Sequence, residues 1–196
     1  MEKNKIALFA SGTGSNAQQL IHYFRNHALV TVSLIVCNKP GAGVTQIAER
    51  EGVELMLIDK NKLQSPDFPK VLLEKGTDYI ILAGFLLKIP ESLIQAFPRH
   101  IINIHPALLP KYGGKGMYGH FVHEAVITAR EKESGITIHY VDEQYDHGAT
   151  IFQATCPVTG SDTPESLAQK VHFLEHQHFA PVLEQLINAG SAKSKI

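Results

Sequence analysis

The stretch IALFASGTGSN, residues 6–16, shows how this chain folds. Its first five residues are apolar, as in a strand that is buried on both faces of a parallel sheet. A loop with two glycines follows, and residues 17–24 then have the apolar spacing of an amphipathic helix. We therefore expect a strand, a loop and a helix, which is the repeating unit of an α/β sheet.

The same order recurs along the first half of the chain. Apolar runs predict further strands at 30–37, 54–58, 79–83 and 101–104. Helices are expected at 44–51, 70–75 and 90–97. Residues 59–69 are polar and interrupted by proline, so we expect a loop there. The alternation predicts a Rossmann-like, mostly parallel sheet with helices on both faces.

The pattern changes in the second half. Residues 136–141 alternate between apolar and polar, and residues 149–158 form a second extended run. An acidic turn that ends in glycine joins them, which predicts an antiparallel strand pair added to the sheet. Thr163 and Pro164 fit the cap and first residue of a final helix. We expect a single domain over 1–190, with residues 191–196 as a disordered tail.

Composition and charge exclude several functions. The 196 residues are 44% hydrophobic, as in an ordinary globular domain. The net charge of −1 argues against a nucleic-acid partner. The apolar runs are too short for a membrane span, and the one at 6–10 is too short for a signal peptide. We expect a cytoplasmic protein without a membrane partner.

No metal is expected. Cys37 and Cys156 lack the spacing of a metal-binding pair, and in a cytosolic protein they are expected to be reduced thiols. His172 and His176 stand four residues apart on a helix, a spacing that suits zinc. A third ligand in a matching segment is missing, which favours a helix face turned to solvent or substrate.

Asn103 and His105 are candidate catalytic residues at the end of a predicted strand. Side chains two apart in a strand lie on the same face. An amide can stabilise a developing oxyanion while an imidazole moves a proton, and a downstream carboxylate, Asp146, can set the charge of the imidazole. This combination favours acyl transfer. The alternative is a strand-to-loop transition whose polar side chains satisfy the backbone, with Asp146 as a turn aspartate.

Two further segments lie at the carboxyl ends of predicted strands, where α/β sheets bind ligands. Gly14, Ser15 and Asn16 open a helix, and free N–H groups at that place suit a phosphate monoester. The alternative is a glycine turn that only joins two elements. Residues 83–90 are apolar and could contact a flat aromatic ligand. From the residues alone, core packing is the better interpretation of that segment.

Four blocks, at 11–16, 82–89, 103–112 and 139–148, together resemble the phosphoribosylglycinamide formyltransferase family. The pattern Asn-x-His-Pro-x-Leu-Leu-Pro with a later Asp is specific for folate-dependent formyltransferases. Ser-Gly-x-Gly-Ser-Asn favours the glycinamide ribonucleotide branch. The resemblance implies the formyltransferase fold. It also implies formyl transfer from 10-formyltetrahydrofolate, as co-substrate, to the amine of 5'-phosphoribosylglycinamide in de novo purine biosynthesis, without a metal.

The resemblance also implies roles for particular residues. The substrate phosphate is expected at Gly14, Ser15 and Asn16. The folate is expected at Leu86, Leu87, Lys88, Ile89 and Asn103. The catalytic residues are expected to be Asn103, His105 and Asp146, with Glu175, next to His176, as a further substrate contact.

The chain departs from the family pattern at three places. Leu86, Leu87 and Lys88 stand where the family usually has Met-Arg, and residues 59–77 lack the arginine found before the fourth strand. The loop from Lys111 to His123 is longer than usual. The first two departures affect the expected contacts with the folate tail, whereas Asn103, His105 and Asp146 are unchanged.

Other functions remain open at this point. A formyltetrahydrofolate hydrolase would use the same three residues but would carry an additional N-terminal domain. A methionyl-tRNA formyltransferase would carry a C-terminal domain and more basic charge. A non-catalytic phosphate-binding module would need only the glycine loop. The protein is expected to be a monomer or a homodimer.

Overall fold

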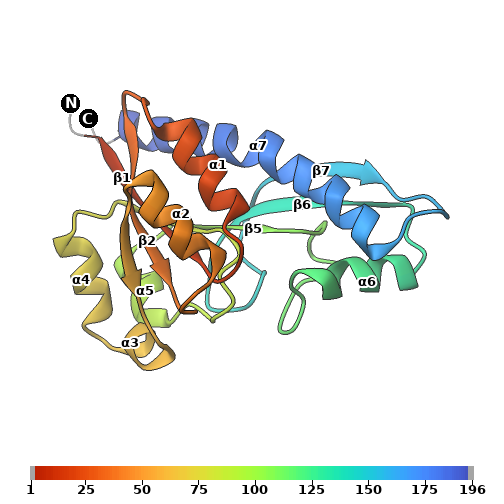
Figure 1. Ribbon diagram of the computed structural model, residues 1–196, viewed down its shortest axis with the longest axis horizontal. Helices are drawn as coiled ribbons and strands as arrows, with labels where there is room; N and C mark the ends of the chain where they lie inside the picture. The colour runs from red at the N-terminus through yellow and green to blue at the C-terminus, as the bar shows by residue number, and fades with distance from the viewer. Residues whose placement is uncertain (1–2, 194–196) are drawn as a thin grey trace. The chain divides into compact units, whose positions relative to one another are not determined.

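The structure, a computed structural model, describes residues 3–193, except for the side chains of residues 191–193 (Figure 1). Its strands are β1 (Asn4–Ala10), β2 (Val30–Cys37), β3 (Glu54–Leu57), β4 (Tyr79–Leu82), β5 (Ile101–His105), β6 (Glu133–Tyr140) and β7 (Thr150–Pro157). They form a seven-stranded sheet in the order β3-β2-β1-β4-β5-β6-β7. The pairs β1–β2, β1–β4 and β2–β3 are parallel, and β6–β7 is antiparallel. The predicted fold class is confirmed.

The helices alternate with the strands. They are α1 (Ser15–Phe24), α2 (Gly43–Glu51), α3 (Lys60–Gln64), α4 (Phe68–Glu74), α5 (Glu91–Ala96), α6 (His120–Thr128) and α7 (Pro164–Lys193). Helix α2 ends where expected, at Gly52 in the left-handed region with φ 67°. No helix within residues 3–193 has both the length and the apolar character needed to cross a membrane.

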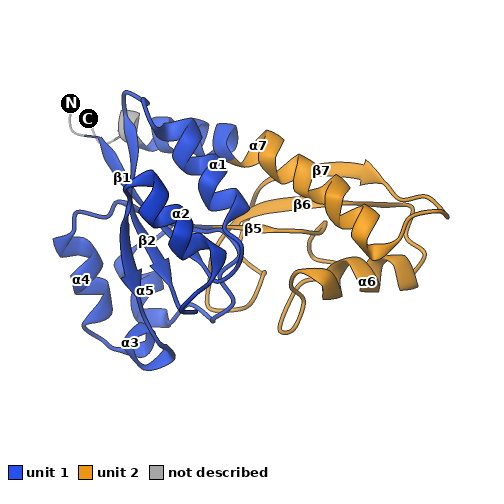
Figure 2. Ribbon diagram, in the orientation of Figure 1, with its two compact units in different colours: residues 1–102, 180–196 blue, residues 103–179 orange. Residues whose placement is uncertain are grey.

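The chain divides into two compact units (Figure 2). The first consists of residues 1–102 and 180–196, and the second of residues 103–179. β5 and α7 have residues in both units. The expected single domain over 1–190 remains a prediction. Of the tail expected at 191–196, residues 191–193 belong to α7 and residues 194–196 lie outside the described part of the chain.

The core of the first unit is built on β1. Residues 6–10 are fully buried, and the ring of Phe9 lies 5.2 Å from that of Phe85 and 6.4 Å from that of Phe68. Burying such a side chain contributes roughly 1.5–3 kcal/mol, so this cluster holds the loops at the end of β1 in place.

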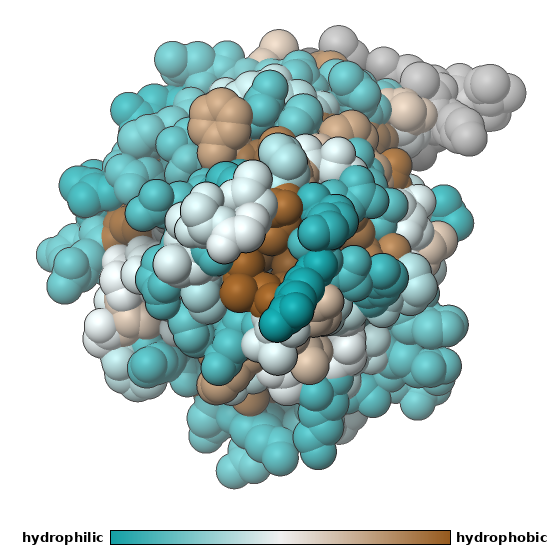
Figure 3. Space-filling view, turned by 90° about the vertical axis from the view of Figure 1, so that its right-hand side faces the viewer, coloured by the Kyte–Doolittle hydropathy of each residue, from teal (hydrophilic) through white to brown (hydrophobic). Residues whose placement is uncertain are grey.

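On the face shown in Figure 3, hydrophilic residues cover most of the surface and hydrophobic residues gather near the centre of the view.

Two loop expectations were wrong. Residues 59–69 contain α3 and the first residues of α4, because the Asp59 carboxylate caps α3 by accepting from the Lys62 amide at 2.7 Å. The segment from Lys111 to His123 is not all loop, because α6 begins at His120. Its start at Gly119 has no side-chain cap, so the usual sequence signal for a helix start is missing.

Candidate active site

The second unit brings Asn103, His105 and Asp146 together. The first two lie in β5, and Asp146 lies in the turn between β6 and β7. Asp146 Oδ2 is 3.5 Å from His105 Nδ1, and Asp146 Oδ1 accepts from Asn103 Nδ2 at 3.4 Å. The side chains of His105 and Asp146 are 4% and 11% exposed, so their charges interact with little screening by water. An amide, an imidazole and a carboxylate thus form one cluster.

The turn that carries Asp146 is held in an unusual conformation. Asp146 has φ 55°, in the left-handed region that non-glycine residues seldom adopt. Its Oδ2 accepts from the Gly114 amide at 3.0 Å. At Gly148, a Cβ would lie 1.9 Å from the Tyr140 carbonyl oxygen, so this position requires glycine. The close approach of the two backbones directs Asp146 toward β5.

His139, on β6, orients the Asn103 amide. His139 Nδ1 lies 2.8 Å from the Tyr140 carbonyl oxygen, which can only accept, so Nδ1 carries the proton. His139 Nε2 lies 3.1 Å from Asn103 Nδ2 and 3.7 Å from Asp146 Oδ1, and in the neutral ring it accepts from the Asn103 amide. The second Nδ2 hydrogen makes only the long 3.4 Å contact with Asp146, so this hydrogen is available to a developing oxyanion.

Both ring nitrogens of His105 face acceptors. Nε2 donates to the Tyr112 carbonyl oxygen at 2.7 Å, and Nδ1 faces Asp146. Burial lowers the pKa of His105, while the Asp146 charge and the Tyr112 carbonyl act in the opposite direction without cancelling the effect of burial. Asp146 thus acts to raise the pKa of His105, but the net shift of that pKa is downward. His105 is therefore neutral at rest, and its two acceptors favour the imidazolium once a proton arrives.

Asp146 itself is held in its charged form. Burial raises its pKa, but the neighbouring His139 and His105 rings and the Gly114 amide together lower it below its usual value. Asp146 is thus a carboxylate at neutral pH. It can balance a positive charge on His105 during a reaction.

The loop after β5 is supported by two polar side chains of the neighbouring strands. Thr137, on β6, donates to the Ala107 carbonyl oxygen at 2.7 Å and accepts from the Leu109 amide at 3.0 Å. Gln153, on β7, donates to the Leu109 carbonyl oxygen at 3.0 Å and to Thr137 Oγ1 at 2.8 Å. Our sequence analysis assigned no role to Thr137, His139 or Gln153. Polar residues in the alternating pattern of β6 and β7 were the available signal.

The predicted phosphate loop lies in the first unit, at the start of α1. Gly14 precedes the helix with φ 83°, and a Cβ there would lie 2.8 Å from Val44 Cβ and Ile47 Cδ1. The loop therefore packs tightly on α2 and needs glycine at this position. Ser15 and Asn16, both half-buried, are in the first turn of α1, whose N–H groups can bind an anion.

The predicted folate segment, residues 86–89, lies in the same unit as the phosphate loop. Ser11 connects them, because its Oγ accepts from the Leu86 amide at 3.0 Å and its amide donates to the Gly84 carbonyl oxygen at 3.0 Å. Leu86 is 49% exposed and Lys88 is exposed, whereas Ile89 is buried. An exposed leucine in an irregular loop can contact a flat ligand, which a core residue cannot.

Glu175 and its neighbours lie on the part of α7 that belongs to the second unit. Glu175 and His176 are both half-buried. The rings of His172 and His176 pack against each other with centroids 4.0 Å apart. Within the described part of the chain, no group of three or more histidine, cysteine, aspartate or glutamate residues is arranged to hold a metal ion.

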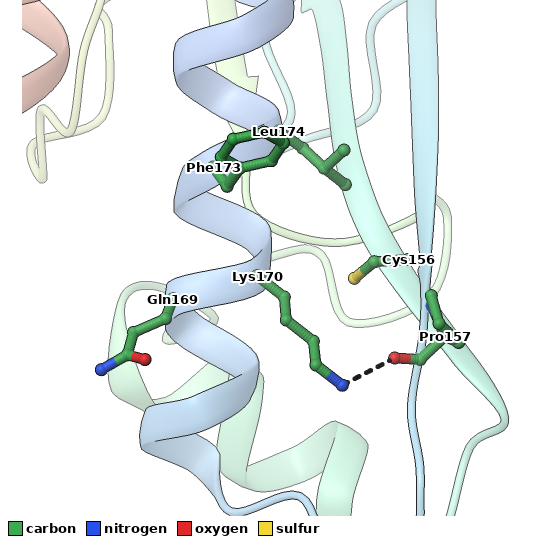
Figure 4. A pocket seen from close by; sticks show the side chains of 6 residues that line it. All are labelled: Cys156, Pro157, Gln169, Lys170, Phe173 and Leu174. Carbon is green, nitrogen blue, oxygen red and sulfur yellow. Dashed lines mark hydrogen bonds between the residues drawn. The ribbon is translucent and has the colours of Figure 1, made fainter.

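A groove of about 470 Å³ lies between β7 and α7 in the second unit (Figure 4). It is lined by Cys156, Pro157, Gln169, Lys170, Phe173 and Leu174. The Lys170 ammonium donates to the Asp162 carboxylate at 2.7 Å and to the Pro157 carbonyl oxygen at 3.2 Å, so its charge is already paired. None of the lining residues belongs to the set predicted from the sequence.

Comparisons with known proteins agree on one family. The chain matches the formyl transferase family over residues 4–183. It is 33% identical over 197 residues to the phosphoribosylglycinamide formyltransferase of Bacillus subtilis, and the match covers 97% of this chain and 98% of that protein. It is 41% identical over 189 residues to the chloroplastic phosphoribosylglycinamide formyltransferase of Arabidopsis thaliana, covering 92% of this chain. The chain spans only 64% of the length of that plant relative.

Solved structures agree with this similarity. The crystal structure of glycinamide ribonucleotide transformylase 1 from Geobacillus kaustophilus has a TM-score of 0.85 with this chain at 33% identity. The aligned part covers 94% of this chain and 99% of that one.

Proposed function

The chain belongs to the formyl transferase family, in its phosphoribosylglycinamide formyltransferase branch, and from this premise we propose its reaction. It transfers the formyl group of 10-formyltetrahydrofolate to the amine of 5'-phosphoribosylglycinamide, a step of de novo purine biosynthesis. The observation that carries the proposal is the cluster of Asn103, His105 and Asp146 within the second unit.

Asn103 acts on the oxyanion. The substrate amine attacks the formyl carbon, and the carbonyl oxygen gains negative charge as the new C–N bond forms. Asn103 Nδ2 donates its weakly engaged hydrogen to that oxygen, while His139 holds the amide in the donating orientation. The bond from the formyl carbon to the folate nitrogen then breaks and releases formylated product.

The pair of His105 and Asp146 moves the proton. The attacking amine loses a proton and the leaving nitrogen gains one, so the reaction needs one proton transfer between them. His105 is neutral at rest, and Asp146 with the Tyr112 carbonyl stabilises the imidazolium. The positive charge then also stabilises the neighbouring oxyanion.

The substrates are proposed to bind through three groups of residues. The start of α1, with Gly14, Ser15 and Asn16, binds the substrate phosphate through its N–H groups. The loop of Leu86, Leu87, Lys88 and Ile89, together with Asn103, contacts the folate. Glu175 is a further substrate contact. Leu86 is exposed, which supports the folate assignment. Covering its apolar side chain with a ring removes that surface from water and stabilises the complex.

Location and assembly complete the proposal. Cys37 and Cys156 are free thiols, which supports a reducing compartment such as the cytoplasm. The net charge of −1 supports small-molecule partners in place of nucleic acid. A monomer or a homodimer is proposed.

The test is a formyl-transfer assay with the purified protein and both substrates, followed by folate absorbance. We expect turnover only when the amine substrate is present. Loss of the formyl group without the amine would indicate a hydrolase that uses the same three residues. Phosphate-ligand binding without any turnover would replace the enzyme with a binding module.

A further inference from the structure

The turn of residues 111–114 connects two of the catalytic side chains through its backbone. The Tyr112 carbonyl oxygen accepts from His105 Nε2 at 2.7 Å, and two residues later the Gly114 amide donates to Asp146 Oδ2 at 3.0 Å. Any movement of this turn therefore changes the position of His105 and Asp146 together.

The turn is not in a conformation that it would adopt by itself. Tyr112 has φ 56°, in the left-handed region that a tyrosine seldom occupies without surrounding contacts. A Cβ at the next residue, Gly113, would lie 2.6 Å from Leu109 Cδ2 and 3.2 Å from Asp146 Cβ, so the turn is packed on one side. Gly113 is packed in this way, but the Tyr112 side chain needs a contact of its own to keep its backbone in the left-handed region.

Glu131 supplies that contact from the segment between α6 and β6. Its Oε1 accepts from the Tyr112 hydroxyl at 2.9 Å and from Lys111 Nζ at 2.9 Å. The Glu131 side chain is 25% exposed, against 66% for Lys111. The hydrogen bonds from Lys111 and Tyr112 lower the pKa of Glu131, so it stays ionised, and a charged acceptor makes the stronger hydrogen bond.

We propose that Glu131 is a positioning residue, which holds the Tyr112 side chain so that the Tyr112 carbonyl stays on His105 Nε2. Tyr112 is then anchored at both ends, by its hydroxyl to Glu131 and by its carbonyl to His105. The side-chain hydrogen bonds of Glu131 within the described part of the chain are with Lys111 and Tyr112. It acts only through the backbone of the turn, and the inference uses the proposed function only where a reaction rate is measured.

The effect on His105 has a definite sign. The groups that face His105 are the Asp146 carboxylate, the Tyr112 carbonyl, and the rings of His139 and His123. The carbonyl favours the protonated ring, whereas both histidine rings disfavour it when they are charged. When the turn loosens, the protonated ring loses an acceptor, and the pKa of His105 falls further.

The test is a histidine NMR titration of the full chain, which needs no substrate. The His105 signal is identified by its absence from a His105→Asn variant. Tyr112→Phe removes the hydroxyl, and Glu131→Ala removes its acceptor. Glu131→Gln removes the charge but keeps an oxygen that accepts from the hydroxyl. Glu133→Gln, at an exposed glutamate two residues away, is the matched control.

We expect Tyr112→Phe and Glu131→Ala each to lower the pKa of His105 by about 0.5 to 1 unit, and Glu131→Gln to restore most of the wild-type value. An unchanged His105 pKa in Tyr112→Phe would overturn the proposal. So would equal shifts in Glu131→Gln and Glu131→Ala, because the charge alone would then be the cause. If Glu131→Ala does not fold, Tyr112→Phe carries the same test.

Kinetics give a second readout. Tyr112→Phe and Glu131→Ala should lower kcat by roughly 3- to 10-fold with little change in KM, because the loss lies in orientation and not in substrate binding. Their double variant should be no worse than either single variant, since both break one contact. Additive losses would overturn the proposal. Absence of formyl transfer in the wild type would reject the proposed function, while the NMR titration would still decide the role of Glu131.

Discussion

At the scale of single residues, the candidate site depends on which atoms are already engaged. Asn103 has two amide hydrogens, and His139 holds one of them at 3.1 Å. The other reaches Asp146 only at 3.4 Å. This arrangement fixes the orientation of the amide and leaves one donor for a developing charge, which is how a preorganised oxyanion site works.

Replacing Asn103 tests whether its amide donates to a developing oxyanion. Asn103→Ala should fold and bind both substrates, and its kcat should fall by ~10²–10³-fold, because an oxyanion donor is lost. Steady-state kinetics with both substrates measure the change. Asn61→Ala, an exposed position on α3, is the control and should keep the wild-type rate. A variant at Asn103 that keeps most of its turnover would remove this residue from the mechanism.

Asp146→Asn tests the charge that faces His105. The carboxylate favours the imidazolium, so its loss should lower the pKa of His105 beyond the effect of burial. The limb of the pH–rate profile that reports His105 should move to lower pH, and the rate at pH 7 should fall by roughly 10²-fold. The profile of kcat/KM between pH 5 and 9 measures both. A limb that moves to higher pH would show that Asp146 does not act through this charge.

At the scale of elements, the turn between β6 and β7 places Asp146 beside β5. The turn depends on a close approach of two backbone segments at Gly148, where a Cβ would lie 1.9 Å from the Tyr140 carbonyl oxygen. A backbone atom cannot move aside as a flexible side chain can. The position of the Asp146 carboxylate is therefore set by a residue that has no side chain.

Gly148→Ala should displace this turn. We expect a loss of at least about 2 kcal/mol in the free energy of unfolding, since the added methyl group meets backbone and not a side-chain tip. Formyl transfer should fall with it, because Asp146 moves. Urea denaturation and the activity assay measure the two effects. The control is Gly160→Ala, where a Cβ would meet nothing within 4 Å, and it should be close to neutral.

At the scale of the whole molecule, buried histidines connect stability to pH. Burial, followed by the charges of His120 and His105, lowers the pKa of His123 on α6 to about 4. Burial also lowers the pKa values of His105 and His176. Between about pH 6.5 and pH 4 the unfolded chain binds a proton at His123 that the folded chain does not bind. Stability is therefore complete above this window and is lost as the pH falls through it.

His123→Leu should remove part of this loss. For a histidine with the shift of His123, lowering the pH from 7 to 5 costs about 2 kcal/mol of stability. The wild type should lose at least that amount, and the variant should lose correspondingly less. Urea denaturation at the two pH values measures the difference. Equal stability of the wild type at both pH values would contradict the prediction.

The alternation of strands and helices could be predicted from the sequence, because apolar periodicity is a local property of the chain. The sequence predicted the strands β1, β2 and β4 and the final helix close to their observed starts. It also identified Asn103 and His105 as a pair, since two residues apart on a strand means one face. The sequence analysis missed α3 and α6. Helix α3 has only the Asp59 side chain as a start signal, and α6 begins after Gly119 without a side-chain cap.

The surroundings of that pair could not be predicted from the sequence, because they form only when the chain packs. The contacts of Asp146, His139, Tyr112 and Thr137 join residues that are remote in sequence, and periodicity carries no information on such distances. The protonation of His105 was also decided by the tertiary structure. A sequence shows that a carboxylate is available to raise its pKa, but burial acts more strongly, and burial exists only once the chain has packed.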